Sequence, residues 1–456
     1  MQRLTIFMIV VVTLFDFLGS GDRFGNGGFL PSSISYFAEL VSAAAMAYVI
    51  FAGTRNRFQF VRPAYWLSFG SLLLVIIFAL IANHVDSGPI IAGMRSYLRA
   101  MPWFFIPAVY AFSEEEVRGQ FKVLLAICFI EVPVAVLQRI QTADRSWGFV
   151  AVTGDWTTGT LGDAGTLSIF LVCAICIITA LFERKKLSLF RFILLFFVVL
   201  VPTMINETKA MVAFLPLGLL LTFLYASPPE IRYRKVFGGV ALLLVFGAVF
   251  VPVYDALNAD RQYGQSLGDF FFKEGNVDAY VSTGGAEVGT TKDIGRGDSI
   301  AVPIKELSKD PVSLLFGLGI GNASDSSLGP GFNGFYADKW RVFLQTQFSR
   351  FILELGALGV TLILFIYLLI FQDCKAVARA DKGTFGAMAA GMTGVIGLIT
   401  LTMFYSKIEV FPSLSYLFWY FAGLIAAHRM RMVSVRDVAP AREQVGSRVA
   451  LSHGTR

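Results

Sequence analysis

Long apolar runs separated by short polar segments dominate this 456-residue sequence and restrict what it can fold into. An α-helix needs about 20 predominantly apolar residues to cross a bilayer, and lipid offers no partner for unpaired backbone groups. Only 15% of the residues are charged, whereas a soluble domain carries about 25%. The pattern predicts an all-α integral membrane protein with many membrane-spanning helices.

Twelve runs have the length and composition of candidate spans. The first resembles a signal peptide in length, but no clean small-x-small cleavage site follows it, and we interpret it as a retained span. Most runs approach the length that a crossing helix needs. The predicted spans are roughly residues 4–19, 33–53, 65–83, 96–112, 121–140, 164–182, 190–206, 210–226, 236–254, 349–371, 384–404 and 411–428.

Lys and Arg residues indicate the orientation. With the N-terminus in the cytoplasm, every cytoplasmic segment contains basic residues, as the positive-inside rule requires. The opposite orientation would place all of them outside, so both termini are predicted to be cytoplasmic. The basic residues between spans are Arg55, Arg57, Arg62, Arg118, Lys122, Arg184, Lys185, Lys186, Arg191, Arg232, Arg234, Lys235, Lys375, Arg379 and Lys382.

The spans divide the chain into four parts. Residues 1–254 would contain nine transmembrane helices, and residues 349–428 three more. Residues 255–348 form a long external connection, and their apolar and aromatic content predicts a partly helical cap over the bundle. Residues 429–456 form a basic cytoplasmic tail without periodicity, which we expect to be disordered. A helix within the cap is indicated by Ile300, Ile304 and Leu307.

Two arginines four residues apart, Arg95 and Arg99, would share one helix face at the external side. A lone arginine at a helix end usually extends to the bilayer surface as an anchor. A pair on one face also suits a diphosphate, because each guanidinium can hold two phosphate oxygens. Both interpretations are open from the residues alone. Other charged residues at predicted external helix ends are Arg139, Arg145, Lys407 and Glu409.

Acidic residues at the same predicted face could act as general bases. Asp155 and Asp163 flank the stretch DWTTGTLGD, where they suit either turn and N-cap roles or acid–base chemistry. Glu207 and Lys209 could form a local ion pair of small energetic weight. The residues alone do not rank these acids.

Two more glutamates, Glu131 and Glu354, lie inside predicted spans, where an acid serves function or forms a structural hydrogen bond between helices. The sequence contains no cluster of His, Cys, Asp or Glu with the spacing of a metal site. It also contains no Gly-rich nucleotide loop after a strand. We therefore expect neither a metal nor another cofactor, and no nucleic-acid partner.

Four blocks, taken in order, resemble motifs of the O-antigen ligase and polymerase superfamily. VTGDWTTGTLGDAGTLSIFL (152–171) resembles its Gly-Thr-x-Gly block before a central span, and INETKAMVAF (205–214) resembles its Ser-Arg-small motif. GRGDSIAVPIKELSKDPVSLLFGLGIG (295–321) resembles the loop motif in which an Arg-led helix leads to a Gly-x-Gly-x-Gly turn. QTQFSRFILELGALGVTLIL (345–364) resembles the block ending in Glu-x-Gly-small-x-Gly. The predicted spans and the late external loop also fit this family.

The sequence departs from the ligase motifs at two positions. Gln345 stands where ligases carry a histidine nine residues before Glu354, and glutamine cannot serve as a general base. Lys209 replaces the motif's arginine, which keeps the charge but loses the bidentate fork. These departures favour a Wzy-type polysaccharide polymerase over a ligase.

The resemblance implies a GT-C-like helical bundle in the bacterial inner membrane, with the large loop in the periplasm. It implies metal-independent, inverting transfer of a glycan from undecaprenyl diphosphate to another lipid-linked repeat unit. Membrane lipid, a chain-length regulator and a flippase are candidate partners. The residues that would bind the diphosphate are Arg95, Arg99, Lys209 and Arg296. The candidate bases are Asp155, Asp163, Glu207 and Asp298, and further site candidates are Gln345 and Arg350.

Two other functions fit the same pattern. A ligase would transfer the glycan to a lipid or protein acceptor and would differ from a polymerase in its acceptor alone. A flippase or other transporter of lipid-linked oligosaccharide would more often carry charges in mid-span and a two-fold internal repeat. The predicted charges gather instead at external helix ends, and the two halves show no repeat.

Overall fold

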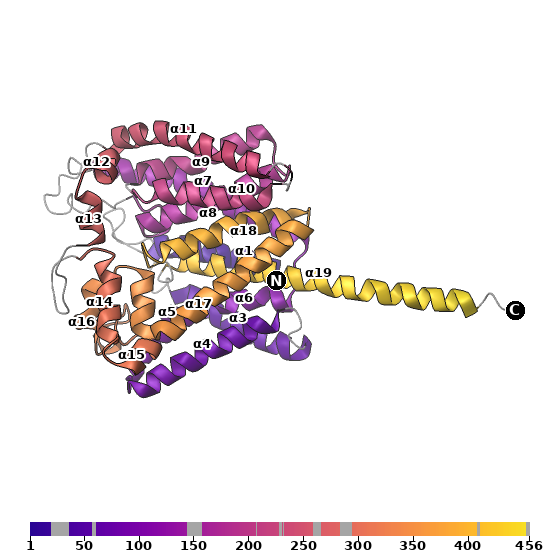
Figure 1. Cartoon of the computed structure of the whole chain (residues 1–456), viewed down its shortest axis with the longest axis horizontal. Helices are drawn as coiled ribbons and strands as arrows, with labels where there is room; N and C mark the ends of the chain where they lie inside the picture. The colour runs from indigo at the N-terminus through magenta and orange to yellow at the C-terminus, as the bar shows by residue number, and fades with distance from the viewer. Residues whose placement is uncertain are drawn as a thin grey trace.

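The chain folds into a bundle of long helices that lie side by side (Figure 1). The described residues are mostly α-helical and contain no β-strand. The computed structural model describes residues 1–19, 36–56, 61–143, 157–206, 208–227, 230, 232–258, 266–282, 294–407 and 411–452.

Six helices of the described part are long and apolar enough to cross a bilayer, which makes this an α-helical membrane protein. Two of them, α8 and α18, are mostly buried and lie at the centre of the bundle, whereas α3, α4 and α7 expose much of their apolar surface, as expected of helices that face lipid. The six helices are α3 (Phe37–Asn56), α4 (Pro63–Ala82), α7 (Glu114–Ala143), α8 (Ala164–Glu183), α17 (Gln347–Ala380) and α18 (Thr384–Thr402).

Shorter or interrupted helices complete the bundle. The first predicted span is divided into α1, a π-helical turn and α2. The last predicted span lies within a longer helix, α19. These elements are α1 (Gln2–Val10), η1 (Val11–Phe15), α2 (Asp16–Gly19), α9 (Leu189–Ile205), α10 (Met211–Ala226), α11 (Arg232–Asn258) and α19 (Pro412–Ser452).

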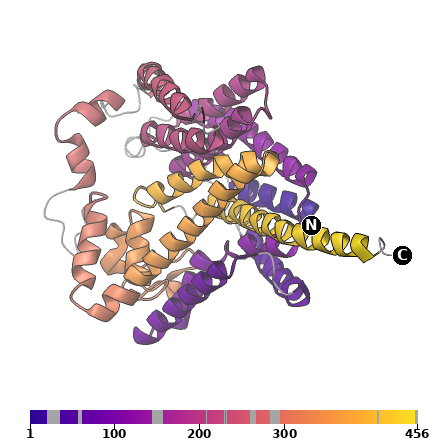
Figure 2. The same ribbon diagram turned by 45° about the vertical axis from the view of Figure 1, so that its right-hand side comes forward.

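The bundle has two distinct ends (Figures 1 and 2). At one, called the loop end here, short helices of the long connection gather. At the other, called the tail end, α19 projects beyond the other helices. This projection carries the helix to Ser452, through most of the tail that the sequence predicts to be disordered.

Hydrogen bonds between distant segments tie neighbouring helices together at each end. At the loop end the Phe348 N–H of α17 donates to the Met403 carbonyl, which follows α18, over 2.8 Å. At the tail end the Thr384 N–H of α18 donates to the Glu114 carboxylate of α7 over 2.7 Å. Helices α17 and α18 therefore run in opposite directions, and α7 and α18 begin at the same end of the bundle.

The predicted span over residues 96–112 is wrong as one continuous helix. α5 (Ser87–Leu98) ends, and α6 (Pro102–Val109) begins after a break of three residues. Pro102 occupies the first turn of α6 and has no N–H to donate to the preceding turn, so the ladder of helical hydrogen bonds stops there.

Together, α5 and α6 still connect the two ends of the bundle. Gly93 of α5 packs directly on the backbone of Ile320 in the long connection, at the loop end. The Pro107 carbonyl of α6 accepts a hydrogen bond of 2.6 Å from Arg431 of α19, at the tail end. From Trp103 to Val109, α6 is buried inside the bundle.

The long connection is partly helical, and one of its helices covers the predicted segment around Ile304. That helix, α14, buries Leu307 as expected, but Ile304 is exposed and Ser299 and Pro303 complete the buried face. The elements of the connection are α12 (Leu267–Phe272), α13 (Asn276–Val281), α14 (Asp298–Leu307), α15 (Pro311–Phe316), η7 (Pro330–Phe332), α16 (Ala337–Trp340) and η8 (Arg341–Phe343).

A kink in α17 locks the connection onto the bundle. Gly356 has a φ of 65° inside the helix, and Gly317, with a φ of 74°, crosses it. A Cβ on Gly317 would lie 2.6 Å from backbone atoms of the kink. Because the kink frees the Leu353 carbonyl, that oxygen accepts a hydrogen bond of 2.7 Å from the Leu318 N–H. Only glycine suits Gly317 and Gly356, because both have a positive φ and lie against the backbone of the other segment.

A buried ionic network holds the tail end. Asp373 of α17 is fully buried and lies 2.7 Å from the Arg62 guanidinium, beside α4. Its carboxylate also pairs with Arg429 of α19 and accepts a hydrogen bond of 2.7 Å from the Tyr65 hydroxyl of α4. This network joins α4, α17 and α19, because a buried carboxylate is stable only when its oxygens are paired.

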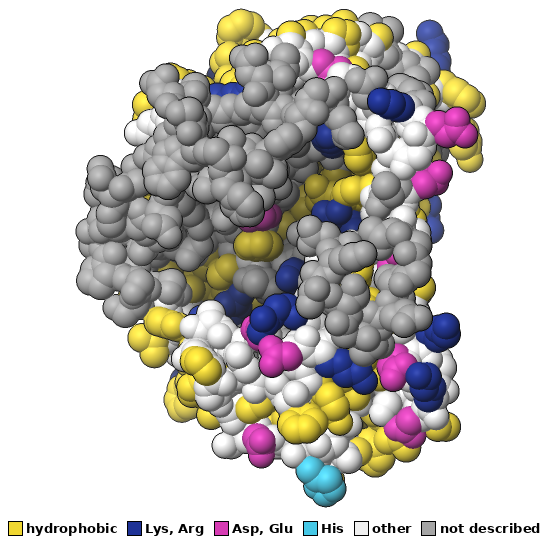
Figure 3. Space-filling view, turned by 90° about the vertical axis from the view of Figure 1, so that its left-hand side faces the viewer, with side chains coloured by type: hydrophobic (Ala, Val, Ile, Leu, Met, Phe, Trp, Pro, Cys, Tyr) yellow, Lys and Arg dark blue, Asp and Glu magenta, His cyan; other side chains and the backbone are white. Residues whose placement is uncertain are grey.

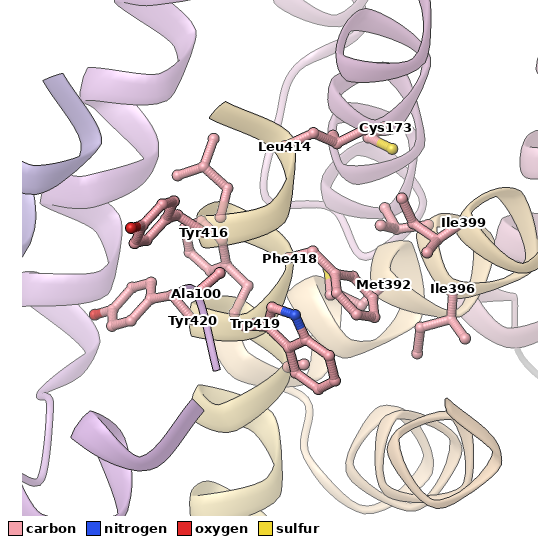
Figure 4. Close-up of a cluster of buried hydrophobic side chains, with 14 of the residues drawn as sticks. Ala100, Cys173, Met392, Ile396, Ile399, Leu414, Tyr416, Phe418, Trp419 and Tyr420 are labelled. Atoms are coloured by element: carbon pink, nitrogen blue, oxygen red, sulfur yellow. The ribbon is translucent and has the colours of Figure 1, made fainter. Parts of the chain in front are cut away.

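Aromatic side chains of α19 build much of the core (Figure 4). Phe418 points towards Met392 of α18, whereas Tyr416 and Tyr420 point to the opposite side of the helix. There both tyrosine rings pack edge-on against Trp103 of α6, with ring centroids 6.3 and 6.1 Å apart. The broken helix α6 is thus held by aromatic packing inside the bundle.

The crossing of Gly356 and Gly317 predicts a specific sensitivity. Gly356→Ala should lower the free energy of unfolding by about 1–3 kcal/mol, because the added Cβ strains a positive φ and meets the backbone of the connection. Thermal unfolding in detergent measures the change. Gly70→Ala is the matched control, since no atom lies within 4 Å of its added Cβ. Equal unfolding temperatures for both variants would contradict this account of the kink.

Candidate functional site

The predicted arginine pair meets a carboxylate that the sequence analysis did not select. Arg95 of α5 lies 2.6 Å from the Glu39 carboxylate of α3, and Arg99 lies 3.4 Å from the same oxygen. Arg95 also donates a hydrogen bond of 2.7 Å to the Ser327 hydroxyl, and its guanidinium lies 4.8 Å from the Tyr36 ring. Glu39 offsets one of the two positive charges, so the pair joins α3, α5 and the long connection.

Arg296, the residue that leads into α14, is held between two aromatic rings. Its guanidinium carbon lies 4.2 Å from the Tyr280 ring centre and 4.9 Å from that of Tyr405. Its Nε donates a hydrogen bond of 3.0 Å to the Tyr405 carbonyl. Within the described part of the chain, no carboxylate forms an ion pair with Arg296. The two rings and the carbonyl orient the cation without neutralising it.

Lys407 lies two residues beyond Tyr405 and belongs to the same group. Burial lowers the pKa of the Lys407 ammonium, and the nearby positive charge of Arg350 lowers that pKa further, whereas Asp325 and Asp163 oppose the shift. We call Arg296, Arg350 and Lys407 the cationic cluster. Lys407 is a charged residue at a predicted external helix end, but none of the family-like blocks contains it.

Arg350 is almost fully buried and contacts an acid of its own helix. Its Nε lies 3.4 Å from the Glu354 carboxylate, and its guanidinium lies 5.2 Å from the Tyr97 ring. Glu354 also accepts hydrogen bonds of 2.7 Å from the Tyr97 hydroxyl and from Ser324. Of the two readings open for Glu354, these contacts favour the structural one: it ties α5, α17 and the connection together.

Asp163 adopts the N-cap role and also lies near the cationic cluster. Its carboxylate accepts hydrogen bonds from the Thr166 N–H at 2.7 Å and the Thr166 hydroxyl at 2.9 Å, which caps α8. Its charge acts on Lys407. A Cβ on Gly165 would lie 3.7 Å from the Tyr405 ring, so the start of α8 adjoins the cluster.

The glycine-rich segment before α8 is fixed by two side chains of α7. The Glu131 carboxylate accepts a hydrogen bond of 2.8 Å from the Thr160 N–H and a second from the Thr160 hydroxyl. The Gln138 amide oxygen accepts from the N–H groups of Thr158 at 3.0 Å and Gly159 at 2.8 Å. Glu131 therefore has structural partners that hold the chain leading to Asp163.

Lys209 reaches the cluster through a row of aromatic rings. Its Nζ lies 4.8 Å from the Phe270 ring centre, and the Phe270 and Tyr280 rings pack edge-on with centroids 5.4 Å apart. Tyr280 in turn contacts Arg296. Two cations, Lys209 and Arg296, therefore lie at either end of a pair of packed rings at the loop end.

The remaining predicted site residues are Asp298, Gln345, Asp155 and Glu207. Asp298 interacts with the Ser282 hydroxyl at 3.1 Å from each carboxylate oxygen. Gln345 is exposed and donates a hydrogen bond of 3.1 Å to the Val342 carbonyl. Asp155 and Glu207 lie outside the described residues.

The surface at the loop end is hollowed near its centre (Figure 3). Lys and Arg side chains lie along the wall of the hollow, and hydrophobic side chains lie beside them. Among the described residues, no three His, Cys, Asp or Glu side chains form a group that could hold a metal. The arrangement suits an anion whose charge is met by guanidinium and ammonium groups.

No family model matches this chain, and no curated protein matches it either.

The burial of Lys407 predicts how stability depends on pH. Because the folded state lowers the pKa of this ammonium from the ordinary 10.5, the unfolded chain binds its proton more tightly. The folded state is therefore penalised at neutral pH, and the penalty disappears as pH rises towards 10.5. Lys407→Met should unfold at a higher temperature than the parent at pH 7, and the difference should shrink by pH 10.

Lys309→Met provides the control, because Lys309 is exposed and pairs with Glu306 in the last turn of α14. Its unfolding temperature should stay close to that of the parent across the same range. A parent protein more stable than Lys407→Met at pH 7 would show that the partners of Lys407 outweigh its burial.

Proposed function

We propose that this chain is a membrane glycosyltransferase of the O-antigen ligase and polymerase superfamily, which joins polyprenyl-diphosphate-linked oligosaccharides into a polysaccharide. The observation that carries the proposal is the cationic cluster at the loop end. Its cations come from segments that resemble that family's motifs, apart from Lys407. The substrate class follows from that resemblance, and the charge of the site fits it.

We assign the loop end to the external side of the membrane. Every predicted cytoplasmic basic segment would then lie at the tail end, in agreement with the positive-inside rule. The chain would cross the bilayer twelve times, with α5 and α6 together forming the fourth crossing. In a bacterium the loop end would face the periplasm.

The diphosphate is the leaving group in this reaction. The acceptor hydroxyl attacks the anomeric carbon, the bond from that carbon to the diphosphate oxygen breaks, and the configuration inverts. Negative charge develops on the diphosphate, and cations fixed in advance stabilise it without reorganising. Arg296 would bind phosphate oxygens through its fork, because two rings already hold it in place, and Lys407 would add a point charge.

The acceptor hydroxyl must lose its proton as the new bond forms. Of the four candidate bases, Asp163 is supported best, because its charge acts on Lys407 and its position is fixed by the cap of α8. The oxygen of Asp163 that receives both Thr166 hydrogen bonds would keep the carboxylate oriented. The other oxygen would take the proton.

The contacts of the predicted cations favour some of them over others as ligands of the diphosphate. Arg95 and Arg99 share Glu39 as a counter-ion, whereas Arg296 has aromatic and carbonyl partners. We therefore assign the leaving diphosphate to Arg296 and Lys407, and a supporting role to Arg95 and Arg99 at the adjoining wall.

Replacement of the cluster cations tests the proposal. Arg296→Ala and Lys407→Met should each lower the amount of polymer about 100-fold or more in a strain lacking the chromosomal gene, because each removes a charge from the developing diphosphate. Polymer is measured by gel analysis of extracted glycan. The controls are Arg118→Ala and Lys309→Met, whose side chains are exposed at other positions. Normal polymer from both cluster variants, at normal protein levels, would refute the assignment.

Analysis of lipid-linked glycan in the deletion strain separates the three functions. Accumulation of single repeat units on the outer leaflet indicates a lost polymerase. Long polymer that stays on its lipid carrier indicates a lost ligase. Repeat units retained on the cytoplasmic leaflet indicate a lost flippase.

A further inference from the structure

An apolar cavity of about 90 Å³ lies inside the bundle, between α7, α8, α18 and α19. Every side chain that lines it is a hydrocarbon, an aromatic ring, a thiol or a thioether. Leu414 of α19 and Cys173 of α8 approach each other at this place (Figure 4). None of the residues that form the cationic cluster lines the cavity.

The cavity follows the direction of the helices. On α8 its lining extends from Phe170 to Leu181, which corresponds to about 16 Å along the helix axis. Phe170 lies about two turns from Asp163, and Ile399 of α18 lies about two turns from Tyr405. One end of the cavity therefore lies about 10 Å along α8 from Asp163, on the side of the cationic cluster, and the other approaches the tail end.

One wall of the cavity is less enclosed than the others. Leu124 and Leu125 of α7, and Ala174 and Ile177 of α8, line it and are only half-buried. The lining residues of α18 and α19 are buried, for example Met392. The wall formed by α7 and α8 is therefore the least enclosed part of the lining, and α9 packs on both of these helices.

The chemistry of the cavity selects its ligand. Helices in a membrane associate largely through close packing, so a void between four of them loses contacts that an inserted chain would restore. A chain without polar groups fits the lining, and an anionic head on that chain would meet the cations at the loop end. An isoprenoid diphosphate has both properties.

We propose that this cavity binds the first isoprene units of a polyprenyl diphosphate, with the diphosphate at the cationic cluster. This inference rests on the proposed function and adds the position of the lipid carrier to it. The chain would lie along α7 and α8, and its head would stay within reach of Arg296 and Lys407. The cavity would thus set the depth at which the diphosphate is held.

Photo-cross-linking tests the proposal on the purified full-length protein in detergent. The probe is farnesyl diphosphate with a benzophenone at its hydrophobic end, and mass spectrometry locates the adducts. We expect adducts on lining residues of α7, α8, α18 and α19. Ala174→Phe, which fills the cavity from one wall, should lower labelling about tenfold, equivalent to a loss of about 1.4 kcal/mol of binding free energy. Ala44→Phe, on the exposed face of α3, should label like the parent.

Competition identifies the head group and the lipid class. Unlabelled farnesyl diphosphate should displace the probe, farnesol should displace it more weakly, and phosphatidylglycerol should have little effect. Equal displacement by phosphatidylglycerol would show a phospholipid site and overturn the proposal. Adducts confined to other helices would overturn the proposal as well. If Ala174→Phe fails to fold, the positions of the adducts in the parent protein still test the proposal.

The outcome also separates this proposal from the proposed function. If the protein produces polymer but gives no adducts in the cavity, the proposed lipid site is refuted and the proposed glycosyltransferase function still stands. Cavity adducts in a protein whose deletion leaves polymer unchanged would refute the glycosyltransferase and leave an isoprenoid-diphosphate site.

Discussion

One backbone hydrogen bond, from the Leu318 N–H to the Leu353 carbonyl, connects the long loop to the membrane bundle. The bond exists because α17 is broken at Gly356, which frees a carbonyl that an unbroken helix would have used. Apolar surroundings make such a bond strong and make its loss expensive. The half of α17 before the kink carries Arg350 and Glu354, so the position of the candidate site follows from this crossing.

The sequence predicted most of the helices because each depends on local chemistry. A run of apolar residues near the length of a bilayer crossing forms a helix whatever its neighbours are. The exception, residues 96–112, also has a local cause, since Pro102 interrupts the hydrogen bonds of a helix that hydropathy alone treats as continuous. Hydropathy measures burial and does not measure whether each N–H has a partner.

The site was less predictable because its properties arise between segments far apart in the chain. Nothing in the sequence pairs Arg95 and Arg99 with a counter-ion, whereas in the fold Glu39, more than fifty residues earlier, lies beside both. Arg296 was predicted from the resemblance, but the rings of Tyr280 and Tyr405 that orient it come from two other segments. A one-dimensional pattern gives the charge of a residue and leaves its counter-ion unknown, although the counter-ion decides whether that charge is available to a ligand.

The network around Asp373 gives the bundle a fixed frame. By joining α4, α17 and α19 at one end, it makes their separation there expensive, because a buried carboxylate would lose its partners. Helices α7 and α8 are outside this network. A widening of the space between them would therefore move these two helices while the network keeps α4, α17 and α19 together.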